Sequence, residues 1–447
     1  MTVKIFRGWY VVTAAALINV YGAGVWFYGF PILYPALLDE FGWTAAGGAA
    51  IASLSRLEGS LEGPIVGWLV DRYGPRRLAI IGAIIFGFGY MVMSQISGDG
   101  YGIGPLQMTA FSAFVLLYAG WMSIGYNTGF GHASQAAVNA WFIKKRSRAF
   151  MLFSLGAGGS GLTVLAFGWG IANYGWRPTV FLSGVGIFLI IIPLSLVLVH
   201  KPEQVGLLPD GESPEDLKVQ PSDSESAIDS TTDGDVIENE YDFGVIEAIK
   251  TFSFWMIIVG TGSRSVAMTS VIIHQVKYLT DIREISDIQA SAALGATVTI
   301  SVVGRTIFGW LGDYIDKRYL LIAATLLQAF GIFILANATN MALVWVYAAM
   351  YGIAYGGGIP VYMAIVGDYF GRKNYATIRG FMQMFQIPAT VTGPIFAGWV
   401  FDTTGNYQIA FTTFIGSMLV GIVFLFLAKR PRIPTGTPQG NIAEMTG

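Results

Sequence analysis

Twelve apolar segments impose the strongest constraint on how this chain folds. A helix of about 20 apolar residues spans a bilayer core about 30 Å thick, so each segment predicts a membrane-spanning helix. The predicted spans are residues 9–34, 46–70, 78–97, 109–140, 149–172, 178–199, 252–279, 288–311, 319–337, 342–367, 376–400 and 408–428. Only 12% of the residues are charged, whereas soluble domains contain about 25%. Composition and pattern together predict an all-α integral membrane protein.

Lysine and arginine gather in alternate turns between these segments. The basic turns and the N-terminal segment contain Lys4, Arg7, Arg72, Arg76, Arg77, Lys144, Lys145, Arg146, Arg148, Lys317, Arg318, Arg372, Lys373, Lys429, Arg430 and Arg432. By the positive-inside rule, these turns and both termini are predicted to lie in the cytoplasm of a multi-pass protein of the cell membrane. The first apolar segment is long and contains Asn19, so we expect a membrane span there rather than a cleavable signal.

Residues 200–248 differ from the rest of the chain because they are acidic and carry few apolar side chains. Such a composition predicts a disordered cytoplasmic linker. The linker divides the chain into an N-terminal six-helix half, residues 1–199, and a C-terminal six-helix half with a short tail, residues 249–447.

The two halves repeat each other. The turn after the second helix reads GWLVDRYGPRR from Gly67, and its counterpart after the eighth reads GWLGDYIDKR from Gly309. Repeats of this kind place a substrate site between the halves of a transporter. We expect Asp71 and Asp313 to face the positive N-termini of neighbouring helices, and nearby basic residues to pair with acids and hold a cytoplasmic gate shut.

These turns resemble the signature loop of the major facilitator superfamily. The residues that carry the resemblance are Gly67, Asp71, Arg72, Gly74, Arg76, Arg77, Gly309 and Asp313. The chain further resembles the branch of monocarboxylate porters and oxalate–formate antiporters through Arg7-Gly8-Trp9, the segment Trp141–Gly161, and Arg305 followed by Gly309. The resemblance implies twelve helices in two pseudo-symmetric halves that transport by alternating access.

Arg305 is the central candidate for substrate binding. It precedes Asp313 by eight residues, so a rise of about 1.5 Å per residue places it near the middle of the membrane. An arginine at that depth is costly and indicates function, although it can instead pair with a helix end or snorkel. In the branch that the chain resembles, this arginine binds a substrate carboxylate, which a planar guanidinium matches well.

The chain departs from that branch at two places. Ser301 stands where the eukaryotic monocarboxylate porters have an aspartate, so no acid lies one turn before Arg305. The oxalate-type exchangers have a lysine on the eleventh helix, where this chain has Gln383 and Gln386. A pocket specific for dicarboxylates is therefore less supported.

Further charges are predicted near the membrane centre. Arg264 is either a second substrate contact, part of a gate, or the partner of an acid on the second helix. That helix carries Arg56, Glu58 and Glu62, and the two glutamates share a face. With Arg305, these charges sum to one excess positive charge, which would accommodate one monoanion. Glu58 and Glu62 are candidates for proton coupling, and the alternative is a fixed ion-pair network between the halves.

Polar side chains in the glycine-rich fourth and tenth helices complete the predicted site. The repeat pairs Asn127 with Tyr355, and both could donate hydrogen bonds to a substrate, as could Tyr28 and Gln383. The alternative is that they only join helices to one another. His132 is a candidate proton carrier or, alternatively, a hydrogen-bond partner of a neighbouring helix.

The sequence therefore predicts a secondary transporter of a small organic carboxylate, favouring a monocarboxylate such as lactate, driven by protons or a counter-anion. A dicarboxylate–monocarboxylate exchanger and a non-transporting carboxylate receptor are the alternatives. Neither an enzyme nor a cofactor is expected. No cysteine, metal-ligand cluster or nucleotide-binding GxxxxGK[ST] loop occurs. The expected partners are the substrate and the lipid bilayer, without nucleic acid, and the functional unit is expected to be a monomer.

Overall fold

The computed structural model describes residues 6–43, 51, 54–55, 57–98, 101–103, 106–211 and 241–433. The N-terminal half contains α1 (Arg7–Val25), α2 (Gly29–Phe41), α4 (Gly63–Tyr73), α5 (Pro75–Met93), α6 (Ala110–Phe114), η1 (Val115–Met122), α7 (Ser123–Tyr126), η2 (Asn127–His132), α8 (Ala133–Trp141), α9 (Arg146–Gly158), α10 (Gly161–Tyr174), α11 (Trp176–Gly186), η3 (Ile187–Ile191) and α12 (Ile192–Val197). Here η1, η2 and η3 are wider π-helical turns. A short antiparallel hairpin, β1 (Tyr101–Ile103) and β2 (Leu106–Met108), lies between α5 and α6.

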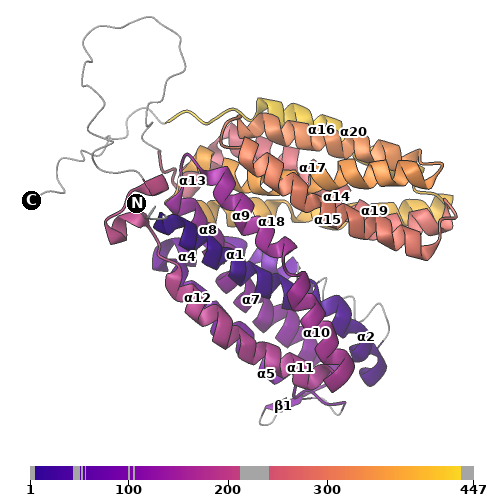
Figure 1. Ribbon diagram of the computed structural model, residues 1–447, viewed down its shortest axis with the longest axis horizontal. Coiled ribbons are helices and arrows are strands. Elements are labelled where there is room, and N and C mark those ends of the chain that lie inside the picture. The colour runs from indigo at the N-terminus through magenta and orange to yellow at the C-terminus, as the bar shows by residue number, and fades with distance from the viewer. Residues whose placement is uncertain are drawn as a thin grey trace, which may run out of the picture.

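The C-terminal half has fewer interruptions. It contains α14 (Phe252–Asp281), α15 (Asp287–Leu311), α16 (Lys317–Ala336), α17 (Met341–Phe370), α18 (Tyr375–Phe385), α19 (Ile387–Thr404) and α20 (Gln408–Leu427). Between the halves lie the short helices η4 (Pro202–Val205), η5 (Pro209–Gly211) and α13 (Val245–Lys250). Figure 1 shows two bundles that meet around α8, α9, α13 and α18 and diverge away from that end.

The predicted all-α membrane architecture is confirmed. Within the described residues, nine helical stretches are long and apolar enough to cross a membrane. The spans predicted at 109–140 and 376–400 are also helical, but π turns divide the first and a break at Gln386 divides the second. The span predicted at 46–70 is described only in part, and Arg56 lies outside the described residues. The first span is longer than predicted, because the chain turns at residues 26–28 and continues as α2.

Carboxylates from each half cap a helix of the other half at the end where the basic turns lie, which we call the basic end. Asp71 on α4 accepts the N–H groups of Ala376 at 3.2 Å and Thr377 at 2.8 Å, and the Thr377 hydroxyl at 2.6 Å. Asp313, after α15, accepts the N–H of Ser147 at 2.8 Å and a hydrogen bond from Arg148. The acceptors therefore lie at the N-termini of α18 and α9, where a negative charge is stabilised. The predicted position of both aspartates is confirmed.

Small residues let these helices approach closely enough for the caps to form. The backbone of Gly67 on α4 lies against that of Ala376 and Thr377 on α18, so a side chain at Gly67 would collide with the backbone. Gly63 and Gly380 touch in the same way one turn further along. Such contacts between small residues are typical of membrane helices.

A partly buried ion-pair cluster adds a second link between the halves. Asp368 on α17 binds Arg146 of the N-terminal half at 2.7 Å and Lys317 of its own half at 2.5 Å. The prediction that basic turns pair with acids is thus confirmed for these residues. Arg76 instead donates to the Leu198 carbonyl at 3.2 Å, and the Arg72 guanidinium lies over the Trp68 ring.

The prediction of disorder is wrong for both ends of the linker. Asp210 accepts the N–H groups of Ile143, Lys144 and Lys145 at 2.8–2.9 Å. Asp242 accepts the corresponding N–H groups of Arg372 and Lys373, at 2.6 and 2.9 Å. The acidic side chains that suggested disorder therefore supply acceptors for backbone N–H groups of these two turns. Residues 212–240 lie outside the described residues.

We predict that Asp313→Asn loosens the basic end. The Asp313 side chain is 1% exposed, and the substitution makes it neutral while it still accepts hydrogen bonds. Hydrogen bonds to charged groups are worth about 1.5–3 kcal/mol each, so the contact is weakened. Opening can be followed by the maleimide reactivity of Met151→Cys, because Met151 packs against Gly309 and the chain has no cysteine. Labelling should become several-fold faster. Asp281→Asn, which breaks an exposed pair with Lys277, is the control, and equal rates in both variants would contradict the prediction.

Candidate functional site

Arg305 extends from α15 to the N-terminal half. Its side chain is buried, with 4% exposed, and its Nη1 donates to the Ser154 carbonyl of α9 at 3.3 Å. Gly158 leaves room for it, since a Cβ there would lie 3.0 Å from Nη1. Ser154 lies near the C-terminus of α9. The alternative in which Arg305 pairs with a helix end is therefore partly correct. The Nε of Arg305 is nevertheless buried without a partner among the described residues.

Arg264 is buried within the C-terminal half. Its Nη2 donates to the carbonyls of Ala354 at 2.8 Å and Tyr355 at 3.0 Å, both on α17. Gly358 provides the space for the guanidinium, because a Cβ there would lie 2.6 Å from Cζ. Among the described residues no acid pairs with Arg264, and its buried Nε has no partner. The alternative that paired it with an acid of the second helix is therefore wrong for the described part of the chain.

Two guanidinium groups thus lie in the protein interior, where the partners found among the described residues are carbonyl oxygens. A buried charge without a counter-ion is strongly destabilising, because the interior solvates it poorly. The ion pairs found among the described residues lie near the ends of helices and do not include Arg264, Arg305, Glu58 or Glu62. The alternative to proton coupling was a network of fixed ion pairs between these deep charges. The described residues do not form such a network. An anion bound here would supply the missing charge.

Glu58 and Glu62 form a separate acidic site within the N-terminal half. Asn127 Nδ2 donates to Glu62 Oε1 at 2.6 Å and to Ser123 Oγ at 3.3 Å. The two glutamates are four residues apart, and Glu58 Oε2 is buried without a hydrogen-bond partner among the described residues. Asn127 starts the π-helical turn η2, a feature that is frequent at functional sites.

The other residues predicted to bind substrate or protons differ in their burial and in the helices that carry them. Tyr28, 40% exposed, directly precedes α2 in the N-terminal half. Tyr355 lies on α17 in the C-terminal half, where its carbonyl accepts a hydrogen bond from Arg264. Gln383 is half-buried on α18. His132, at the end of η2, is buried, and its Nδ1 has no partner among the described residues.

Two polar residues of α18 and its end were not predicted as site residues. Arg379 donates from Nε to Gln135 of the N-terminal half, and its Cζ lies 5.2 Å from the centre of the Tyr362 ring. Gln386 donates to the Thr261 hydroxyl of α14 at 2.7 Å. Arg379 could have been found by the argument applied to Arg305, because it also stands inside a predicted span.

Comparisons with known proteins agree with this architecture. The sequence profile of the Major Facilitator Superfamily matches residues 13–274 and 251–444. Monocarboxylate transporter 13 of Rattus norvegicus is 24% identical over 424 residues, covering 93% of this chain and 87% of that protein. The fold is similar to that of the proton:xylose symporter XylE, with a TM-score of 0.67 and 13% identity over 95% of both chains. It is also similar to the human organic anion transporter MFSD10, with a TM-score of 0.65 and 15% identity, covering 94% of this chain and 99% of that chain.

We predict that Gly358→Ala destabilises the protein through Arg264. The new methyl group would overlap the guanidinium and force it off the two α17 carbonyls, and overpacking of this kind costs about 1–3 kcal/mol. The free energy of unfolding can be measured by titration with a denaturing detergent. Gly262→Ala on α14 is the matched control, because its Cβ would make an ordinary 3.6 Å contact with Ala389. Equal stability of both variants would contradict the assignment.

Proposed function

We propose that this chain, which belongs to the Major Facilitator Superfamily, moves a small organic carboxylate across the cell membrane. Members of the family are multi-pass membrane transporters and not enzymes. The proposed cycle is alternating access, with the basic end in the cytoplasm and a single chain as the functional unit. In the closed arrangement of the basic end, the site would be reached from outside the cell.

The pair of buried guanidinium groups carries this proposal. Arg305 and Arg264 are 4% and 7% exposed and have only carbonyl partners among the described residues. A carboxylate fits a guanidinium through two parallel hydrogen bonds and neutralises its charge. Neither a sugar nor an apolar compound would neutralise them. The resemblance to a protein named as a monocarboxylate transporter supports the same class of substrate.

A monocarboxylate such as lactate is the favoured substrate. Arg305 would bind its carboxylate, and Tyr28 and Tyr355 would donate hydrogen bonds to it from the two halves. Asn127 and Gln383 would lie further along the path as additional hydrogen-bond partners. Apolar and aromatic side chains would surround the rest of the molecule, which limits the substrate to a small acid.

An exchanger of dicarboxylates for monocarboxylates is the second candidate, and the free capacity of Arg264 favours it. Two unpaired guanidinium groups could bind the two carboxylates of one dianion. Competition decides between the candidates: oxalate or malonate should inhibit lactate uptake strongly only if Arg264 also binds substrate.

We predict that Arg305→Ala abolishes lactate uptake into proteoliposomes while the protein remains folded. Removing one partner of a buried charged pair costs about 2–5 kcal/mol of binding free energy. Arg305→Lys should retain part of the uptake, since it keeps the charge but not the planar fork. Arg177→Ala, which breaks a pair with Glu40 away from the site, is the control. Unimpaired uptake by Arg305→Ala would overturn the role of this arginine, and lactate binding without any flux in the native chain would favour a receptor.

Proton coupling is proposed to use the Glu58–Glu62 pair. Glu62 accepts a hydrogen bond from Asn127, Glu58 Oε2 is buried without a partner among the described residues, and neither glutamate makes an ion pair with Arg305 there. His132 is the remaining candidate, because it is buried and its Nδ1 is unpartnered among the described residues. Coupling would then require the substrate and the proton to bind in different halves.

We predict that Glu62→Gln separates coupling from transport. Glutamine can accept the hydrogen bond from Asn127 but cannot carry a proton between the two sides. Lactate accumulation driven by a pH gradient should be lost, whereas exchange of labelled for unlabelled lactate should persist. Glu284→Gln, in the exposed turn between α14 and α15, is the control. Loss of both activities, or of neither, would contradict a coupling role for Glu62.

A further inference from the structure

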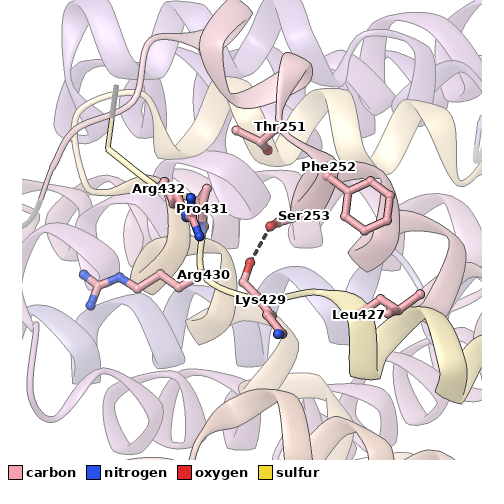
Figure 2. A pocket seen from close by; sticks show the side chains of 8 residues that line it. All are labelled: Thr251, Phe252, Ser253, Leu427, Lys429, Arg430, Pro431 and Arg432. Carbon is pink, nitrogen blue, oxygen red and sulfur yellow. Dashed lines mark hydrogen bonds between the residues drawn. The ribbon is translucent and has the colours of Figure 1, made fainter. Parts of the chain in front are cut away.

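A pocket outside the proposed transport path lies at the basic end of the C-terminal half. Its volume is about 450 Å³, and its walls come from the start of α14 and from the segment that follows α20 (Figure 2). Sites for small ligands typically measure about 300–1,000 Å³. The pocket is therefore large enough for a phosphate-containing headgroup, and none of its residues takes part in the proposed transport site.

One side of the pocket is basic. Lys429, Arg430 and Arg432 line it, and no acidic residue does among the residues described there. All three are exposed, as is typical of side chains that contact the surface of a membrane. Clusters of basic residues immediately after a membrane span attract the anionic lipids of the cytoplasmic leaflet.

The other side of the pocket is apolar. Figure 2 shows Phe252 and Leu427 on the side opposite Arg430 and Arg432. Phe252 is 62% exposed and begins α14, whereas Leu427 is 44% exposed and ends α20. Because both mark the ends of membrane-spanning helices, they lie where the hydrocarbon core meets the headgroups. An occupant with both a charged and an apolar part fits these two sides.

The backbone between the two sides is held in place by hydrogen bonds. The Ser253 hydroxyl donates to the Lys429 carbonyl, as the dashed line in Figure 2 marks. One residue earlier, the Tyr369 hydroxyl donates to the Ala428 carbonyl at 2.7 Å. Pro431 further restricts the segment. The basic residues are thus presented from a fixed segment packed against α14 and α17.

We propose that this pocket binds the headgroup of an anionic phospholipid. The phosphate would contact Lys429, Arg430 and Arg432, and the acyl chains would extend along Phe252 and Leu427. This inference does not depend on the proposed function, because it concerns a different part of the molecule.

The test measures thermal unfolding of the full-length protein in a neutral detergent. Short-chain phosphatidylglycerol, short-chain phosphatidylcholine and inorganic phosphate are titrated separately. Phosphatidylglycerol should raise the unfolding midpoint at concentrations where the other two do not. A triple variant, Lys429→Gln with Arg430→Gln and Arg432→Gln, should weaken this effect by about tenfold or more, since each basic residue contributes to attraction of anionic lipid.

The control is a second triple variant, Lys144→Gln with Lys145→Gln and Lys373→Gln. It removes the same charge elsewhere at the basic end. It should leave the effect of phosphatidylglycerol unchanged, whereas Phe252→Ala should weaken it. Without lipid, the Lys429/Arg430/Arg432 triple variant and Phe252→Ala must each unfold near the midpoint of the native protein. If the triple variant is itself destabilised, Phe252→Ala alone provides the test. The proposal is overturned if phosphate or phosphatidylcholine stabilises as well as phosphatidylglycerol, or if the control triple weakens the effect equally.

Discussion

The two halves of the molecule depend on a carboxylate placed at a helix N-terminus of the opposite half. Asp71 caps α18 and Asp313 caps α9, each through backbone N–H groups that the helix itself leaves free. The attraction is strong because the charge is partly or fully buried, and it is directional because the donors are backbone groups. Together with the ion pair between Arg146 and Asp368, these two contacts hold the halves together at the basic end.

Helices α9 and α15 are joined at two places, one at the cap formed by Asp313 and one at the proposed anion site around Arg305. On α9, the Ser147 N–H reaches Asp313 and the Ser154 carbonyl reaches Arg305. Separation of α9 from the end of α15 would therefore break the cap and remove a partner of the guanidinium together. A bound anion would replace that partner. In the proposed cycle, α9 and α15 would couple substrate binding to opening of the basic end.

Much of the fold could be predicted because its determinants are local. The length of apolar segments sets the spans, and the predicted ends agree with the helices to within a few residues for most of them. The position of Asp71 and Asp313 was also predictable, since the repeat placed both at the same point of their halves. The depth of Arg305 followed from counting residues along one helix. Depth does not reveal partners, however, and Arg264 illustrates this, because its ligands are α17 carbonyls that no pattern marks.

The sequence by itself determined the membrane spans, the two-fold repeat and the presence of charges in apolar segments. Only the tertiary structure decided which charges are paired. It placed the deep arginines against carbonyls, joined Glu62 to Asn127, and used Asp210 and Asp242 of the acidic linker as caps. The physical reason is that solvation in the interior is set by contacts between helices distant in sequence. The residue type fixes which hydrogen-bond or charge partners a buried group requires, whereas packing decides which partners are present.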